Sequence, residues 1–352
     1  MEKLLTLIIP TYNMEKYLRT CLGSLIIGEW QELLEVLVIN DGSKDSSSAI
    51  AHEYANKHPE SFHVIDKENG NYGSCINRGL KEATGRYIKI LDADDYFDNA
   101  SLKLFIQKLQ SVDVDLVLTD NTIFGDNNIS KKYYGFNLPS DSELVFADYC
   151  NSFKGCIQMH NVTYKRDIFS RFNYHQTEGI SYTDMEWIFA PMARVQSFVY
   201  FPIPLYKYLI GREGQTISPE QIKRSISHGL ILTNSMLSMY NEIISDVVPG
   251  IRDYLYFRML REVKSLYRSY LAEVPGLKLE ELSEFDKRLK AEQPELYIDS
   301  ARFTMGPFIR IHYVDYWRKH NYAPQPRLFY SLHNNYMKLL FWCKRLLGIH
   351  RV

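Results

Sequence analysis

The first third of the chain alternates two hydrophobic patterns: continuous apolar runs, and stretches in which apolar residues recur at helical spacing. A short continuous run bounded by turn-forming residues is typical of a strand buried on both faces. Such runs occupy residues 4–9, 34–39, 62–65, 87–91 and 116–118. Helical spacing occupies residues 14–27, 45–57, 72–83 and 101–109. This alternation predicts an α/β fold, Rossmann-like, with a mostly parallel sheet that carries helices on both faces.

Polar residues stand directly after three of the predicted strands, at positions 11–13, 41–43 and 92–94. Ligands of such parallel sheets bind beyond the carboxyl ends of the strands. The three polar clusters are therefore expected to converge in one cleft, and this expectation depends only on the strand pattern.

The middle of the chain has a less regular pattern. Residues 125–142 are polar and are predicted to form a loop. A helix is predicted over 184–193, and strands are predicted at 198–201 and 205–209. These elements complete the first domain, which we expect to end near residue 218.

A helical region is predicted from Ser218 onward. Ser218 is a cap residue, Pro219 suits the first helical position, and Gln221 follows three positions after the cap. Amphipathic helices then extend to about residue 271 with a break at Pro249, and another covers 280–290. We therefore predict two domains. They are residues 1–218 and a C-terminal helical region, residues 219–352.

Composition and charge narrow the class of protein. The 352 residues include 45% apolar and 24% charged side chains, an ordinary globular balance. A net charge of −1 argues against nucleic acid as a partner. Five cysteines, an odd number without metal-ligand spacing, indicate a reducing compartment. We expect neither a signal peptide nor a membrane-spanning helix, and so a cytoplasmic location.

The C-terminal stretch 316–352 has no Asp or Glu but seven Lys or Arg residues. Its apolar residues fall at helical spacing, and they are Leu332, Tyr336, Leu339, Leu340, Cys343, Leu346 and Leu347. A basic amphipathic helix of this kind is suited to the anionic inner face of the plasma membrane, near a lipid-linked acceptor. The alternatives are packing on its own domain, or on a second copy of the chain as a homodimer through the C-terminal helices.

The cluster Asp92-Ala93-Asp94 carries the clearest candidate chemistry. Two carboxylates at a strand end can share a hard cation such as Mn²⁺ or Mg²⁺, together with the phosphate oxygens it binds. Acidic turns are common in proteins, so two nearby carboxylates alone are weak evidence for a metal site. The position of this cluster after the fourth predicted strand strengthens the prediction. Asp41 follows the second strand. It is suited either to accept a hydrogen bond from a base imide or simply to form a turn before Gly42.

Four segments, taken in order, resemble the motifs of family 2 glycosyltransferases, which have the GT-A fold. The segments are Ile9-Pro10-Thr11-Tyr12-Asn13, Asn40-Asp41-Gly42-Ser43, the run from Glu68 to Gly79, and Leu91-Asp92-Ala93-Asp94-Asp95. The resemblance covers roughly residues 4–218. The third segment departs from the commonest family pattern, because Asn71 stands where Gly is frequent and Ile76 where Arg is frequent.

The resemblance implies roles for individual residues. The residues implied to bind the donor are Pro10, Thr11, Tyr12, Asn13, Asp41, Asn69, Asn77, Asp92, Ala93 and Arg212. Thr11 would frame the base through its backbone, Asp41 would bind uracil, and Asp92 would contact the ribose. Asp94 would bind the metal, Mn²⁺ or Mg²⁺. Asp95 is expected to cap the following helix.

A later segment supplies the candidate general base. Residues 182–187 resemble the family's catalytic-base segment, with Asp184 at the base position and Thr183 where many members have Glu. Without the resemblance, a helix cap is the favoured role of Asp184, and the two roles are compatible. Glu186 competes for the base role, but residues two apart on a helix point about 200° from each other.

Two further residues are of interest. Arg212 is suited to bind a pyrophosphate through its planar guanidinium group, or else it is a surface loop arginine. His160 is expected near the acceptor cleft, although a single histidine is more often structural.

The resemblance implies an inverting transfer from a UDP-sugar (UDP-glucose, UDP-galactose or an N-acetylhexosamine form) to a glycan or lipid-linked acceptor. A Gln-x-x-Arg-Trp motif is missing from the sequence, which favours addition of a single sugar over processive synthesis. The alternatives are a nucleotidyltransferase and a non-catalytic sugar-nucleotide-binding protein. A nucleotidyltransferase would need a basic, Gly-rich loop after the first strand. The joint presence of Asp94 and Asp184 argues against a mere binding protein.

Overall fold

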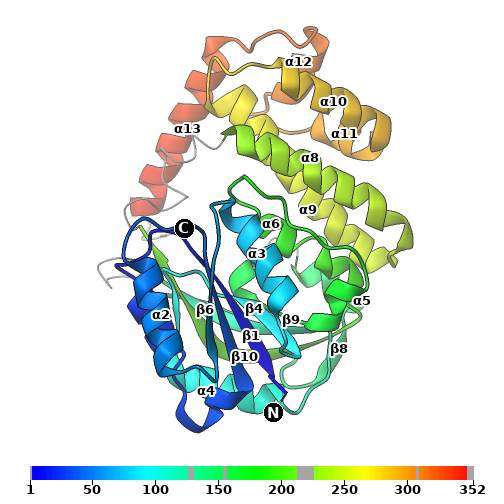
Figure 1. Cartoon of the computed structure of the whole chain (residues 1–352). Coiled ribbons are helices and arrows are strands. Elements are labelled where there is room, and N and C mark those ends of the chain that lie inside the picture. The colour runs from blue at the N-terminus through cyan, green and yellow to red at the C-terminus, as the bar shows by residue number, and fades with distance from the viewer. Residues whose placement is uncertain (1, 126–130, 154–156, 212–225, 307–308, 347–352) are drawn as a thin grey trace. The chain divides into compact units, whose positions relative to one another are not determined.

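The computed structural model describes residues 2–125, 131–153, 157–211, 226–306 and 309–346 (Figure 1). The chain forms two compact units. The first consists of residues 1–228 with 246–254, and the second of residues 229–245 with 255–352. The predicted helix start at Ser218 lies outside the described residues.

The first unit contains a sheet whose central path has the order β3-β2-β1-β4-β9-β6-β10-β5. The strands are β1 Leu5–Thr11, β2 Leu34–Asn40, β3 Phe62–Asp66, β4 Tyr87–Ile90, β5 Tyr96–Phe97, β6 Leu116–Gly125, β7 Lys131–Tyr134, β8 Glu143–Val145, β9 Val162–Lys165 and β10 Ser197–Ile210. Strands β1 to β4 are parallel, and β10 is parallel to β6. The predicted mostly parallel sheet is confirmed. The antiparallel strand β9 between β4 and β6 was not predicted.

Helices of this unit lie on both faces of the sheet, as predicted. They are α1 Leu18–Gly23, α2 Ser47–Lys57, α3 Asn71–Glu82, α4 Asn99–Leu109, α5 Phe146–Tyr149 and α6 Asp184–Trp187. Leu7 and Ile9 of β1 belong to a core that includes buried residues of α1, α2 and α4. Ile8 points to the other face, where a Cβ on Gly79 of α3 would lie 2.5 Å from it. The alternation of side chains along β1 thus supplies both layers.

Short 3₁₀ segments connect these elements. They are η1 Gly28–Leu33, η2 Cys150–Phe153, η3 Met159–Asn161, η4 Arg166–Ser170, η5 Pro191–Arg194 and η6 Ile244–Asp246.

Three local predictions were wrong. The predicted loop 125–142 contains strand β7, and the two strands predicted at 198–201 and 205–209 form the single strand β10 with register shifts between Phe201 and Tyr206. The helix predicted over 184–193 is the short α6, followed by η5. Pro191 lacks an N–H and crowds the preceding turn, which accounts for the interruption of this helix.

The second unit is helical, in agreement with the predicted C-terminal helical region. From residue 226 onward the helices are α8 Ile226–Ile243, α9 Pro249–Arg268, the π-turn η7 Ser269–Glu273, α10 Glu280–Glu292, α11 Pro294–Ser300, α12 Tyr313–Lys319 and α13 Arg327–Leu346. Its core holds a buried ion pair, in which Arg318 Nη2 lies 2.6 Å from Asp286 Oδ1 and Tyr267 also donates to that carboxylate. None of the helices in the described ranges has the length and apolar character needed to cross a bilayer.

Candidate active site

The loops that follow β1 and β2 are bound to each other. Asp41 N donates to Thr11 O at 2.8 Å, next to the pairing of Thr11 with Asn40 at the end of the two strands. Asn13 N donates to Ser43 Oγ at 3.1 Å, and Lys44 N donates to Asn13 Oδ1 at 2.7 Å. The predicted meeting of the first two polar clusters is therefore observed. Pro10 is the penultimate residue of β1 and pairs with Ile39.

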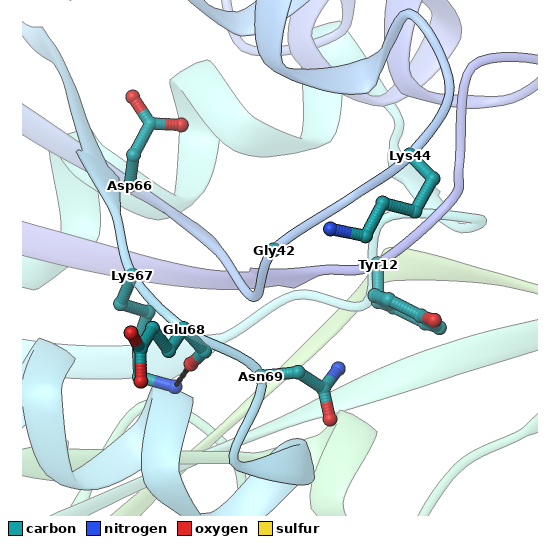
Figure 2. A pocket seen from close by; sticks show the side chains of 7 residues that line it. All are labelled: Tyr12, Gly42, Lys44, Asp66, Lys67, Glu68 and Asn69. Atoms are coloured by element: carbon teal, nitrogen blue, oxygen red, sulfur yellow. Dashed lines mark hydrogen bonds between the residues drawn. The ribbon is translucent and has the colours of Figure 1, made fainter.

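A pocket of about 490 Å³ opens beside these loops, within the size range of small-molecule sites. Its lining residues are Tyr12, Gly42, Lys44, Asp66, Lys67, Glu68 and Asn69 (Figure 2). Tyr12 and Asn69, both predicted to bind the donor, thus line one cavity. Gly42 has a φ of +72°, a conformation that glycine adopts without strain.

Asp41 lies buried next to this pocket. Its Oδ1 accepts from Lys67 Nζ at 2.5 Å and from Gly70 N at 2.9 Å, and its carbonyl accepts from Asn69 Nδ2 at 3.0 Å. The sequence interpretation missed Lys67. It stands directly after β3, so the strand-end rule that identified Asp41 would also have identified this lysine.

Helix α3 packs closely against the loop 175–178. A Cβ on Gly73 would lie 2.0 Å from Thr177 O, so only glycine permits this approach. Asn77 of α3 donates to Gln176 O and accepts from Gln176 N, both at 2.8 Å. Its amide therefore joins α3 to this loop, and the implied role of Asn77 in the donor cleft stays a prediction. Asn71, at a position where the family often has Gly, has a φ of +65°.

The acidic segment after β4, residues 92–95, is called the acid cluster, and its residues alternate between partly exposed and buried. Asp92 and Asp94 are partly exposed, whereas Ala93 and Asp95 are buried. Ala93 belongs to the hydrophobic core, so its position in the motif is explained by packing. Tyr72 OH donates to Asp92 Oδ1 at 2.9 Å, and Asp92 N donates to Tyr206 OH at 3.1 Å. Two tyrosines from distant elements thus fix Asp92.

Asp95 connects this cluster to β10. It accepts from Tyr206 OH at 2.8 Å and from Leu209 N at 2.7 Å. The expectation that Asp95 caps the next helix was wrong, because Asp98 accepts from Ser101 N at the start of α4. Burial, and then the negative charges of Asp94 and Asp92, raise the pKa of the Asp95 carboxyl well above its ordinary value. The acidic groups are therefore close enough to repel each other.

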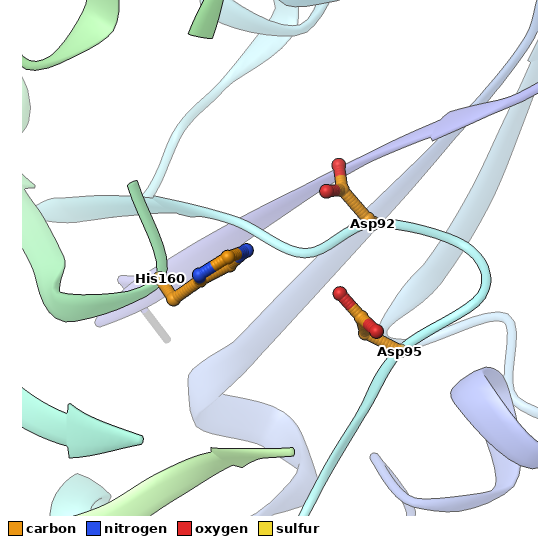
Figure 3. A group of neighbouring side chains, drawn as sticks. All are labelled: Asp92, Asp95 and His160. Carbon is orange, nitrogen blue, oxygen red and sulfur yellow. The ribbon is translucent and has the colours of Figure 1, made fainter. Parts of the chain in front are cut away.

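His160 of η3 lies beside these carboxylates. Ligand atoms of Asp92, Asp95 and His160 lie within 4.8 Å of one another (Figure 3). The imidazole ring packs against Tyr206 and Tyr208, with centroid distances of 4.5 and 4.3 Å. Burial, and next the charge of Lys89, lower the pKa of His160 to about 3, so the ring is neutral at ordinary pH. Carboxylate oxygens with a neutral imidazole are a donor set that fits Mn²⁺. Asp94 is not part of this group of three.

Asp184 is the first residue of α6, and Thr183 rather than Asp184 occupies the cap position. Its charge contributes to raising the pKa of Tyr72 and Tyr208, after burial and together with the charge of Asp92. Asp184 therefore lies within electrostatic reach of the acid cluster. Tyr182, just before it, has a φ of +68°, a rare conformation for a bulky residue.

Glu186 has a different environment from Asp184. It is fully buried, and its two oxygens accept from Thr177 N at 2.7 Å and from Thr177 Oγ1 at 2.6 Å. Gln176, also buried, donates to Thr183 O at 2.8 Å. Glu186 and Gln176 thus connect the loop 175–178 to the start of α6. Arg212, the remaining predicted donor-binding residue, lies outside the described residues.

Comparisons with known proteins agree with this arrangement. Residues 6–172 match the family described as "Glycosyl transferase family 2". The chain is 27% identical over 190 residues to the uncharacterized glycosyltransferase EpsJ of Bacillus subtilis, covering 52% of this chain and 54% of EpsJ. It is 26% identical over 300 residues to the minor teichoic acid biosynthesis protein GgaB of Bacillus subtilis, covering 80% of this chain and 31% of GgaB. The chain thus spans about half, or less, of these relatives' lengths.

A solved structure extends the likeness to most of the chain. The crystal structure of S. aureus TarS 1-349 in complex with UDP-GlcNAc has a TM-score of 0.63 and 20% identity, and the match covers 95% of this chain and 92% of the TarS 1-349 chain. At this identity the likeness shows the fold. The fold and the matched segment define a GT-A glycosyltransferase domain. The chain thus contains a family 2 glycosyltransferase domain, matched over residues 6–172.

Proposed function

We propose that the chain is an inverting glycosyltransferase that moves a hexose or N-acetylhexosamine from a UDP-sugar to an acceptor hydroxyl. The observation that carries the proposal is the presence of three parts in the first unit. They are the pocket beside Asp41, the acid cluster at Asp92 and Asp94, and the carboxylate of Asp184 within electrostatic reach of that cluster. We place the transferase domain in residues 1–218 and an accessory helical region in residues 219–352.

The pocket supports a uridine nucleotide as the part of the sugar donor that the protein binds. Asp41 presents a carboxylate acceptor, which complements the N–H of a uracil imide, and the ammonium group of Lys67 beside it donates to Asp41, Glu68 O and Ser74 Oγ. Tyr12 is 46% exposed and offers a flat face for the base or ribose. The complex of the TarS fragment with UDP-GlcNAc supports the same class of donor.

Residues of the acid cluster fit a divalent metal. Asp94, as the resemblance implies, and Asp92 are the better ligands, because both are partly exposed whereas Asp95 is buried. His160 is a further candidate ligand. Asp94 and Asp92 both raise the pKa of Asp95, and a cation would relieve this repulsion. When bound, the metal would offset the charge of the leaving diphosphate.

Asp184 would act as the general base. The acceptor oxygen forms a bond to the anomeric carbon, the bond from that carbon to the UDP oxygen breaks, and UDP leaves with the electron pair. Asp184 takes the proton of the acceptor hydroxyl. Because the attack comes from the face opposite UDP, an α-linked donor gives a β-glycoside. Glu186 is the poorer candidate, since Thr177 engages both of its oxygens.

The acceptor belongs, in our proposal, to cell-surface glycan assembly. The similarity to a minor teichoic acid biosynthesis protein supports a glycan or lipid-linked acceptor of this kind. We infer the addition of a single sugar per encounter.

Release of UDP from a panel of UDP-sugars tests the proposal. UDP-glucose, UDP-galactose, UDP-N-acetylglucosamine and UDP-N-acetylgalactosamine are each incubated with the protein and Mn²⁺, Mg²⁺ or excess chelator. Metal-dependent release from one donor supports a glycosyltransferase. Formation of UDP-sugar from UTP and a sugar phosphate would instead indicate a nucleotidyltransferase, and UDP binding without any release would indicate a binding protein.

We also propose that α13 docks on an anionic membrane surface. Its first turns pack within the second unit, where Phe329, Tyr330 and His333 are buried. Further along, Leu339 and Trp342 are 56% and 58% exposed and lie three positions apart, on one side of the helix. The helix has no acidic residue, so two copies packed through this side would repel each other, whereas anionic lipid would attract it.

Replacing Leu339 and Trp342 by Ala is expected to abolish flotation with vesicles that contain phosphatidylglycerol. The reason is the loss of two large exposed apolar side chains in the second half of α13, since burial of such surface supplies the binding free energy at an interface. Ser331→Ala, an exposed change on the same helix, is the control and should float like the wild type. Equal flotation of the double variant and the wild type would contradict the proposal. Loss of a dimer in light scattering, with flotation unchanged, would assign this surface to a second copy.

A further inference from the structure

The ladders that pair strand β9 with its two neighbours do not extend back to the segment that precedes it in the chain. Its pairing with β4 stops at Ile88 and Tyr164, and its pairing with β6 stops at Leu118 and Val162. The segment immediately before β9 is η3, Met159–Asn161, which carries His160. No strand pairing holds η3, so side chains must fix its position.

Two buried side chains hold η3 in place. Lys89 reaches η3 from β4, and Asn161 reaches from η3 to β6. Lys89 of β4 donates from Nζ to His160 O at 2.7 Å and to Val162 O at 3.1 Å. Asn161 donates from Nδ2 to Thr119 O at 2.9 Å and to Asn121 Oδ1 at 3.0 Å, both in β6. These bonds replace the missing backbone ladders on the two sides of the segment.

Segment η3 supports both tyrosines that fix Asp92. Tyr72 OH, which donates to Asp92 Oδ1, lies 2.9 Å from Met159 Sδ. Tyr206 accepts from Asp92 N through its OH group, and its ring packs against the imidazole of His160. A displacement of η3 would therefore change the position of Asp92 through two independent contacts.

A buried lysine at position 89 costs more free energy than a purely structural role requires. It is fully buried, and burial lowers the pKa of its ammonium group to about 7. A buried charge costs free energy even when it is hydrogen-bonded, and a methionine of similar shape would avoid this cost. What the lysine adds, relative to methionine, is directional bonding to two backbone carbonyls.

We propose that Lys89 and Asn161 are positioning residues that fix Asp92 through η3. The inference rests on the proposed function, in which Asp92 is a ligand of the metal that binds with the UDP-sugar. Neither side chain touches the substrate. Their effect is on the placement of the tyrosines that hydrogen-bond Asp92, and hence on the geometry in which the donor reacts.

The test uses the full chain, UDP-N-acetylglucosamine or whichever donor of the panel is hydrolysed, and Mn²⁺. Lys89→Met and Asn161→Leu remove the donors while keeping approximate shape. We expect both to lower kcat for UDP release about 10- to 100-fold, as for a displacement on the order of 1 Å. The dissociation constant of UDP, measured in excess chelator, should not change, because the pocket beside Asp41 is intact. Lys165→Met, which removes a lysine from β9 that pairs with Asp113, is the control and should keep kcat.

A spectroscopic readout separates positioning from a general loss of stability. In NMR spectra of the metal-free protein, the imidazole signal of His160 is assigned by its disappearance in His160→Gln. This signal should shift in both variants, while the signals of the other histidines stay in place. If Lys89→Met does not fold, Asn161→Leu decides the question alone. Wild-type kcat in the folded variants, or a loss of UDP binding in proportion to kcat, overturns the inference. Failure of the wild type to hydrolyse any UDP-sugar would instead count against the proposed function.

Discussion

Asp184→Asn is expected to lower kcat for sugar transfer by about 10²–10⁴-fold, the usual contribution of a general base. Asn has nearly the same shape as Asp but cannot take the acceptor proton. UDP affinity should stay close to that of the wild type, because Asp184 is not among the residues that line the pocket at Tyr12 and Lys67. Initial rates of UDP release, measured with saturating donor, together with calorimetric titration of UDP, check both expectations.

Glu186→Gln is the matched comparison for this variant. Glu186 accepts two hydrogen bonds from Thr177, and an amide can replace only one acceptor, so we expect a lower melting temperature. The kcat of the folded fraction should fall much less than in Asp184→Asn. If Asp184→Asn transfers sugar at a near wild-type rate while Glu186→Gln does not, the two roles are reversed and the assignment fails.

Asp94→Ala is expected to abolish metal-dependent UDP release and to weaken UDP binding when Mn²⁺ is present. A metal bound between a carboxylate and a diphosphate couples the two ligands, so its loss affects the affinity for UDP only in the presence of metal. Titration of UDP with Mn²⁺ and with excess chelator measures this difference. The variant and the wild type should bind UDP equally in the chelator.

Stability measurements show whether this loss comes from unfolding. Asp94 raises the pKa of the buried Asp95, so its removal relieves repulsion, and the metal-free variant should melt no lower than the metal-free wild type. Asp98→Ala is the control, because it removes a nearby carboxylate that caps α4. It should cost about 1 kcal/mol of stability and keep metal-dependent release. Full wild-type activity in excess chelator would refute the metal role of Asp94.

The sequence by itself determined five strands, β1 to β4 and β6, and the strand-end positions of the chemistry. Continuous apolar runs bounded by polar residues are a local signal, because a strand buried on both faces needs apolar side chains at every position. Thr11, Asp41 and Asp92 could therefore be placed at one edge of the sheet before the structure was known. The resemblance then supplied candidate roles for them and for Asp184.

Only the tertiary structure decided which side chains hold these residues in place. Asp92 meets Tyr206 across 114 residues of sequence, and Lys89 meets the carbonyl of His160 across 71. A buried tyrosine or lysine has no periodic or compositional signal that names its partner, since hydrogen-bond partners are set by proximity in the folded chain. The same holds for the contact of Glu186 with Thr177, and for the insertion of β9 between β4 and β6. Pairing of a short strand depends on which edges the rest of the sheet leaves free, and that is a property of the whole domain.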